Sequence, residues 1–508
     1  MDFRQAVGLI GVILAVMAAQ LNDAVVNAAL ADISGGFGIG HDSATWLQTL
    51  FVTGEVVGMC ASPSLGLGFT FRRFALFAIG LSCFSSLFMA LGGGPAPLMI
   101  LRVGQGLASG FSIPLLMTIA LRVLGPEIRI YGLTVYALTA TFFPNLATSF
   151  AALWTDGVGD FRWVFLQVIP LCALAAACVW WGMEQDEPQW DRLKQFDWPG
   201  VLLVAVGFGS LSILLEQGDR LDWFNSDLIC ILAVVSAVAI PAFVAVEMVW
   251  PVPLVRFDLL KRPNFLYAVI VLLVFLVVSL SASQVPLTFL EQVRGYRPIQ
   301  AQLLTLEVAL LQLILLPATA ILLDHRHVDG RWINLIGFLC ILLACFMGAH
   351  ITSNWVRDQF FIMQALQAVG FAFVVMPLLV MATNSLKPEE GPFGSALFNT
   401  PRAVAEAFGV WTLELITRWR GELHRVRIVD LVGQNRLVLG NVGAIPPVPG
   451  PATQGTYGAL NVALEEQVRT LVTMDSFIIL GMLVVFLIGV LALLPVRTYP
   501  PRIQLAKQ

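Results

Sequence analysis

Charged side chains interrupt long apolar stretches of this sequence at several places. They are Asp23, Glu55, Arg102, Glu307, Arg402, Glu406 and Glu414. A charge in such surroundings costs several kcal/mol, and it usually lines a cavity or an ion path. A carboxyl group away from water holds a proton more tightly, and a neighbouring arginine favours its release. These residues therefore carry the chemistry that a proton carrier needs.

Plainer interpretations exist for some of these residues. Arg402 and Glu406 are four residues apart, so they can form a simple ion pair within one helix. Glu307 can tie two helices together. Asp23 and Glu55 have no oppositely charged neighbour nearby in sequence. We predict proton coupling or substrate binding for Asp23, Glu55, Glu307 and Glu406.

Signals for enzymatic or metal chemistry are weak. The segment 324–329 reads Asp-His-Arg-His-Val-Asp, but an arginine stands in its middle. The sequence has no HExxH, no GxSxG, no Walker loop and no Asp-rich prenyl-diphosphate motif. We therefore predict no catalytic residue, no metal and no cofactor. Active transport by such a chain would draw on an ion gradient or on a partner ATPase.

The composition shows what surrounds these charges. Of 508 residues, 58% are hydrophobic and only 12% are charged, whereas soluble proteins carry about 25% charged residues. Apolar runs recur from end to end, and no basic patch suits nucleic acid. The seven cysteines lie inside apolar runs without metal-ligand spacing. The chain is predicted to be an all-α membrane protein with the lipid bilayer as its surroundings.

A helix needs about 20 mostly apolar residues to cross a bilayer. Continuous apolar runs also exclude a β-barrel, whose strands alternate in hydrophobicity. We predict fourteen transmembrane helices, near 6–30, 44–68, 73–93, 97–121, 130–154, 162–183, 198–217, 226–249, 264–290, 298–323, 332–350, 358–383, 392–416 and 474–496.

Orientation and domain organisation follow from the loops between these helices. Basic residues concentrate in alternate loops, which predicts that both termini are cytoplasmic. A faint internal repeat, with a polar pair followed by a proline in helices four and twelve, favours two six-helix halves. We predict a first half over 1–184, two inserted helices and linkers over 185–262, and a second half over 263–508. The second half contains a long extracytoplasmic loop, 417–473.

Two motifs resemble those of a known family. The segment 21–30, which includes Asn27, is similar to the family's L-D-x-T-I-V-N-V-A-L. Helix four carries Arg102, Gln105 and Gly106 in the pattern R-x-x-Q-G. On these residues the chain resembles the major facilitator superfamily, and within it the fourteen-helix drug:proton antiporters of the EmrB/QacA type.

Further positions extend the resemblance along the chain. Pro114 closes the helix-four motif, and Pro144 stands where the family has the proline of G-P-x-x-G-G. Asn399 and Arg402 resemble the family's N-x-x-R segment. The resemblance implies gating or motif roles for Asn27, Arg102, Gln105, Gly106, Pro114, Pro144, Asn399 and Arg402.

The chain also departs from the family's patterns. The acid of helix one is Asp23, one place after the expected position, where Asn22 stands; this turns it by about 100° around the helix. The gate segment 66–73 lacks the usual Asp, and 143–148 lacks the glycines of the antiporter motif. The chain thus resembles a divergent member.

The resemblance implies a function. It predicts a proton-driven multidrug exporter of small amphipathic compounds, bound in a cavity between the halves, in a bacterial inner membrane. A periplasmic membrane-fusion adaptor and an outer-membrane channel are the implied partners, docking at 417–473. The alternatives are a dedicated exporter of one metabolite, such as a siderophore or organic acid, or a receptor or enzyme on a transporter fold.

Overall fold

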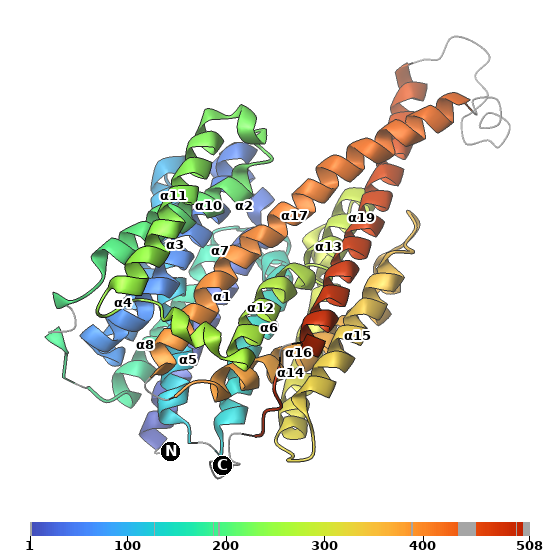
Figure 1. Cartoon of the computed structure of the whole chain (residues 1–508). Helices are drawn as coiled ribbons and strands as arrows, with labels where there is room; N and C mark the ends of the chain where they lie inside the picture. Colours follow the sequence, from blue (N-terminus) through green and yellow to red (C-terminus); the bar gives the residue numbers. More distant parts are fainter. Residues whose placement is uncertain are drawn as a thin grey trace.

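The computed structural model describes residues 3–125, 127–185, 187–190, 194–387, 390–434, 454–493 and 495–500. Every regular element in this part of the chain is a helix (Figure 1). Lipid offers no partner to a backbone N–H or C=O group, so an apolar segment satisfies its own backbone by forming a helix.

The first part of the chain forms a bundle. Its elements are α1 (Phe3–Ala28), α2 (Leu30–Phe37), α3 (His41–Phe69), α4 (Phe71–Leu91), α5 (Pro95–Val123), α6 (Arg129–Ala152), η1 (Leu153–Val158), α7 (Trp163–Leu166) and α8 (Val168–Gly182). Within this bundle α3 packs along α5, and α1 packs against α8.

Two helices and a linker follow. They are α10 (Trp198–Gln217), η2 (Trp223–Asn225), α11 (Asp227–Val249) and η3 (Phe257–Lys261). The helix α10 packs on α11, on α3 of the first bundle and on α17 of the second.

The rest of the chain forms the second bundle. Its elements are α12 (Pro263–Ser279), α13 (Gln284–Arg294), α14 (Pro298–Leu323), α15 (Gly330–Gly348), η4 (Arg357–Phe360), α16 (Phe361–Asn384), α17 (Gly391–Gln434) and α19 (Gln454–Leu493). The two bundles meet where α6 packs against α14 and where α3 and α5 pack against α17.

Each of the fourteen predicted transmembrane ranges falls on a helix or a helix pair. Among the described residues, twelve helices are long and apolar enough to cross a membrane. The helices outside this set include α6 and α17, which carry more polar residues. The chain is therefore a multi-pass membrane protein, while the fourteen crossings and the division at 184 and 262 stay predictions.

The beginning of α1 and the end of α19 lie at the same end of the molecule (Figure 1). Beyond α19, Val496 donates its backbone N–H to Asn264 Oδ1 at 2.7 Å, beside the start of α12. This agrees with termini on one side of the membrane, and the predicted cytoplasmic side remains a prediction.

The segment 417–473, for which the sequence predicts a long loop with a helical stretch over 459–470, is helical over more of its length than predicted. The helix α17 continues to Gln434, and α19 already begins at Gln454, so both project from the bundle (Figure 1). They are joined by apolar contacts of Ile416 with Val468 and Val472. The Gly/Pro-rich centre, 440–458, lies mostly outside the described residues.

Ion pairs also join the two helices of this hairpin. Asp475 of α19 accepts hydrogen bonds from Arg420 Nε and is 2.6 Å from His424 Nε2, one turn further along α17. Arg425 pairs with Glu465 at 2.5 Å. Because residues four apart share a helix face, Arg420 and His424 both reach Asp475.

Candidate functional site

Arg102 is the centre of a buried polar cluster. Its side chain has no exposed surface. It donates from Nη2 to Asp23 Oδ1 at 2.8 Å, from Nη1 to Gln105 Oε1 at 3.0 Å and from Nε to the Leu47 carbonyl oxygen at 3.0 Å. The guanidinium also lies 4.4 Å from the centroid of the Phe51 ring. These contacts, drawn from α1, α3 and α5, fix the arginine in one position.

Asp23 differs from its partner in exposure. Its side chain is 27% exposed, whereas that of Arg102 is fully buried. Asn27, one turn later on α1, donates to Asp23 Oδ2 at 3.4 Å. The neighbouring Asn22 is buried, and it does not take the place of the acid. Asp23 therefore combines an ion pair to a fixed cation with partial exposure.

Glu55 is the second acid of the cluster. It is 6% exposed, and Ser109 donates its hydroxyl proton to Glu55 Oε1 at 2.7 Å. Glu55 lies within electrostatic range of Asp23, Glu406 and Arg402. Charged groups predicted separately on three helices therefore act on one another.

Glycine residues bring α3 and α5 close enough to form this cluster. A Cβ on Gly106 would lie 2.0 Å from the Phe51 carbonyl oxygen, and one on Gly110 would lie 2.2 Å from that of Glu55. Small residues allow such close backbone approach in membrane helices. Gly106 thus positions Phe51 under Arg102 and Glu55 beside Ser109.

Arg402 and Glu406 form the ion pair that their spacing allows, with Nε to Oε1 at 3.0 Å. Arg402 also donates from Nη2 to Gln20 Oε1 on α1 at 3.4 Å. The simple ion pair is therefore present, but it also faces the opposite bundle. The Glu406 side chain is 38% exposed, so it too has access to open space.

A neutral contact joins the bundles nearer the end that holds both termini. Tyr136 donates its hydroxyl proton to Asn399 Oδ1 at 2.8 Å, and Asn399 Nδ2 donates to the Ser395 carbonyl oxygen at 2.9 Å. Ser395 donates from Oγ to the Pro114 carbonyl oxygen at 3.0 Å. We call these four residues the neutral gate.

Ion pairs cross the opposite end of the same interface. Arg297, at the start of α14, lies 2.6 Å from Asp156 Oδ1 and 3.6 Å from Asp32 Oδ1. The Arg297 side chain is largely exposed, so salt can weaken these pairs. The two ends of the interface are therefore closed by different chemistry, neutral at one end and ionic at the other.

Two predicted residues lie apart from the cluster. Glu307 is on α14, and its Oε2 is buried with no hydrogen-bond partner among the described residues. Pro144 lies inside α6, which packs against α14. No described hydrogen bond or ion pair connects Glu307 with Asp23 or Glu55, so the structure does not bring all four predicted acids together.

Sequence reasoning missed several members of the site. Ser109 follows Gln105 by four residues, and Gln20 precedes Asp23 by three. Helical spacing alone therefore places each on the same helix face as a predicted site residue. Tyr136 carried no comparable signal, because its partner Asn399 is 263 residues away.

In the segment 324–329, Asp329 has a structural role. Asp329 accepts the Arg331 backbone N–H at 3.1 Å and so caps the start of α15. It also accepts from Arg331 Nη2 at 2.8 Å. No group of three or more His, Cys, Asp or Glu side chains suited to a metal occurs among the described residues.

A cavity of about 870 Å³ lies between α13, α17 and α19, on the side of the projecting hairpin. Phe289, Leu413 and Val472 contribute apolar walls, and Glu414 and Arg418 contribute charges. The predicted cavity was between the two bundles; this cavity belongs mainly to the second bundle.

Two bundles of apolar helices that pack against each other, with charged side chains on the helices at their interface, are typical of secondary transporters. The profile of the Major Facilitator Superfamily matches residues 12–410, and the chain belongs to that family. This confirms the family expected from the motifs.

Curated relatives refine the placement. The fatty acid resistance protein FarB of Neisseria gonorrhoeae is 26% identical over 89% of either chain. The probable multidrug resistance protein EmrY of Escherichia coli is 25% identical over 89% of this chain and 88% of its own. The multidrug export protein EmrB of Escherichia coli is 27% identical over 81% of this chain and 80% of its own.

Solved structures share the fold. The human organic anion transporter MFSD10 has a TM-score of 0.58 at 12% identity, over 95% of this chain and 100% of its own. The proton:xylose symporter XylE has a TM-score of 0.54 at 12% identity, over 95% of each chain.

Proposed function

We propose that the protein is a proton-driven exporter of small amphipathic compounds in a bacterial inner membrane. The observation that carries this proposal is the ion pair between Asp23, which is partly exposed, and Arg102, which is fully buried. The buried acid Glu55 lies in the same cluster. A proton on Asp23 removes the countercharge of Arg102, so binding and release of the proton change the energy of this buried pair.

Coupling to movement follows from the second bundle's contribution. Arg402 contacts Gln20 on α1 and lies within electrostatic range of Asp23 and Glu55. A change of charge on the first bundle therefore alters the attraction between the bundles. Each proton moving down about 100 mV supplies about 2.3 kcal/mol for this change.

The neutral gate supplies one of the two closures that alternating access needs. Segment 66–73 lacks the acid of the family's charged gate motif, and Tyr136, Asn399, Ser395 and Pro114 join the bundles instead. A few neutral hydrogen bonds are worth about 1 kcal/mol each.

Amphipathic substrates suit the cavity of about 870 Å³, which falls within the usual range for small-molecule sites of about 300–1,000 Å³. It offers both apolar walls and charges. The names of the relatives, which mention fatty acids and multidrug export, support this substrate class. A dedicated exporter of one metabolite, such as an organic acid, is the second candidate.

The projecting hairpin supports a partner outside the membrane. Its α17 has 44 residues, about 66 Å of helix, against about 30 Å of hydrocarbon. Val426, Val429 and Leu431 are exposed along it. We propose that a periplasmic adaptor covers this face and connects the transporter to an outer-membrane channel.

The proposal is tested with purified protein in liposomes. Ethidium, an amphipathic cation, and laurate, an amphipathic acid, serve as probes under an imposed pH gradient. Gradient-dependent movement of both supports a multidrug exporter, and movement of laurate alone supports the dedicated exporter. A protein that moves neither would fit a receptor or an enzyme on this fold.

A further inference from the structure

Two buried carboxyl groups face each other where the inserted helices meet the linker, away from the cluster around Arg102. Asp197 is fully buried and caps α10, accepting the Gly200 backbone N–H at Oδ1 at 2.7 Å. Glu247, on the last turn of α11, is 4% exposed and accepts the Val255 backbone N–H at Oε2 at 3.0 Å.

Each carboxyl group has one oxygen left, and these two oxygens converge. Asp197 and Glu247 are within hydrogen-bonding reach of each other. A Cβ on Gly200 would stand 2.3 Å from Asp197 Oδ2 and 2.9 Å from Glu247 Oε1, so only glycine leaves room for both. Neither oxygen has a hydrogen-bond donor among the described residues.

The chemistry of this contact requires a proton. Ionised carboxylates only accept hydrogen bonds, so two of them cannot bond to each other. Two negative charges on buried carboxylates within hydrogen-bonding reach also repel each other strongly, so both groups cannot stay ionised. A single proton shared between Asp197 and Glu247 resolves both problems, because it supplies the missing donor and removes one charge.

Neighbouring charged groups do not replace that proton. Cys60 on α3 lies within electrostatic reach of both acids, and Lys194 precedes α10 on an exposed segment. In the linker, Arg256 and Asp258 pair with each other at 2.7 Å. No described basic side chain forms an ion pair with Asp197 or Glu247.

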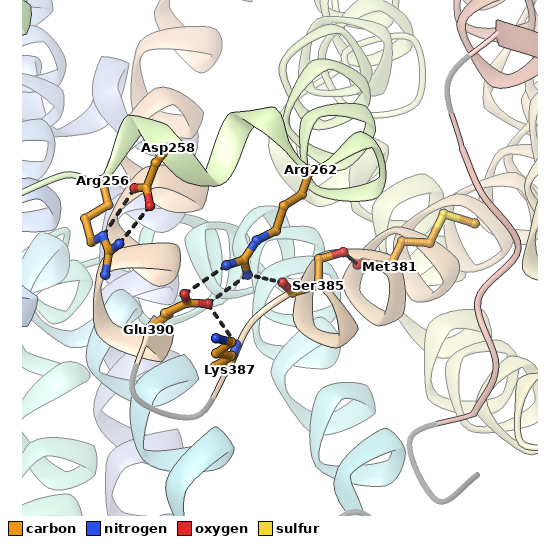
Figure 2. Close-up of polar contacts among 7 residues, drawn as sticks. All are labelled: Arg256, Asp258, Arg262, Met381, Ser385, Lys387 and Glu390. Carbon is orange, nitrogen blue, oxygen red and sulfur yellow. Dashed lines mark hydrogen bonds and ion pairs between the residues drawn. The ribbon is translucent and has the colours of Figure 1, made fainter. Parts of the chain in front are cut away.

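The pair also holds the linker that leads to the second bundle. Glu247 binds the backbone at Val255, and η3 and Arg262 follow within seven residues. Figure 2 shows the far end, where Arg262 donates to both carboxylate oxygens of Glu390, at 2.7 and 2.8 Å, and also to the Ser385 carbonyl oxygen. Glu390 directly precedes α17, the helix of Arg402.

We propose that Asp197 and Glu247 form a second proton-binding site, and that the proton held there fastens the linker 250–262 to the inserted helices. The site binds a proton outside the cluster of Asp23 and Glu55. It does not depend on the proposed export function, since it acts on the folded protein with or without a substrate.

The two ends of the linker then respond to pH differently. Loss of the shared proton on raising the pH leaves two facing charges, so the fastening at Asp197 and Glu247 is present at low pH and lost as the pH rises. At the other end, hydrogen bonds from Arg262 hold the pKa of Glu390 at about 2, so that ion pair persists throughout. At alkaline pH the linker should therefore come away from Glu247 at Val255, while Arg262 stays bound to Glu390.

Infrared spectra and hydrogen exchange of the purified full-length protein test this site. The wild type should show the carbonyl stretch of a buried protonated carboxyl group that disappears in the double variant Asp197→Asn/Glu247→Gln. Hydrogen exchange of the Val255 backbone amide is corrected for the pH dependence of exchange in an unstructured peptide. Its rate should then rise at least several-fold between about pH 6 and about pH 9, because the shared proton leaves.

Asp197→Asn keeps the cap of α10 and places an amide donor against Glu247, so exchange at Val255 should no longer depend on pH. Glu247→Gln gives a second route to the same result if the first variant folds poorly. Asp227→Asn, at the exposed opposite end of α11, is the control and should behave like wild type. An unchanged carbonyl stretch in the double variant, or the same pH dependence at Val255 in the single variants, would overturn the proposal.

Discussion

At the scale of single residues, the position of one acid distinguishes this chain. Asp23 stands one place after the position expected from the family pattern, and the structure shows it 2.8 Å from Arg102 while Asn22 is buried beside it. The shift of the acid by one position along α1 therefore directs its side chain towards Arg102. Types and helical positions of Asp23, Glu55, Arg102 and Arg402 could be predicted from sequence. Their pairing could not, because the partners are 79 residues apart or lie on different bundles.

Moving the acid back tests whether this register matters. Asp23→Asn should abolish gradient-driven export, and adding Asn22→Asp should not restore it, because a side chain one place earlier points about 100° away. Drug resistance of cells and flux in liposomes measure the effect. Restored export in the Asn22→Asp/Asp23→Asn protein would show that the pairing with Arg102 is not required.

The neutral gate gives a second prediction at this scale. Tyr136→Phe removes the hydrogen bond to Asn399, so the gate should lose about 1 kcal/mol and open more often. Labelling of a single cysteine placed near Ser395 should become about fivefold faster. Tyr131→Phe is the matched control, since Tyr131 lies exposed on the same helix. Equal labelling rates in the two variants would remove Tyr136 from the gate.

At the scale of elements, the close crossing of α3 and α5 positions the site. The sequence predicted both helices and marked Gly106 as a motif residue, yet only the packed backbone shows why a glycine is needed there. The same limit applies to α17, which continues to Gln434 and forms ion pairs with α19 that no local pattern reveals.

Gly106→Ala should therefore destabilise the protein. Its Cβ would lie 2.0 Å from a backbone oxygen of α3, and overpacking of this kind costs about 1–3 kcal/mol. Gly80→Ala is the control, because nothing lies within 4 Å of its Cβ. Thermal unfolding in detergent should show a lower Tm for the first variant only; a shared change would mean that the crossing can relax.

The ion pair between η3 and α17 predicts a flat pH response. Its hydrogen bonds from Arg262 lower the pKa of Glu390 from 4.5 to about 2. The stabilisation is thus complete above the ordinary pKa and is lost only as the pH falls towards about 2. Glu390→Gln should lower the Tm by the same amount at every neutral or alkaline pH. A difference that grows with pH would contradict this assignment.

At the scale of the whole molecule, contacts join the two bundles at both ends of their interface. The charged residues Asp23, Arg102, Arg402 and Glu406 lie between these two ends. Neutral hydrogen bonds close one end and the exposed pairs of Arg297 close the other. The hairpin of α17 and α19 extends the second bundle beyond this interface (Figure 1). The family could be predicted from sequence, whereas the hairpin's shape could not.

The hairpin's exposed face predicts a partner-specific defect. The double variant Val426→Ser/Val429→Ser should leave flux in liposomes unchanged. It should reduce the drug resistance of cells and the amount of periplasmic adaptor that co-purifies with the protein. Both residues lie exposed on one face of α17, three positions apart. Full resistance in cells that carry this double variant would exclude the face as the docking site.

Export driven by protons is the central claim, and flux in liposomes tests it most directly. Ethidium and laurate are measured with wild type, Asp23→Asn and the gate control Tyr131→Phe, each shown to be folded by its thermal unfolding. We expect wild type and Tyr131→Phe to move at least one probe against its concentration gradient only when a pH gradient is imposed, and Asp23→Asn to move neither. Active flux through the Asp23→Asn protein equal to that of wild type would contradict the claim.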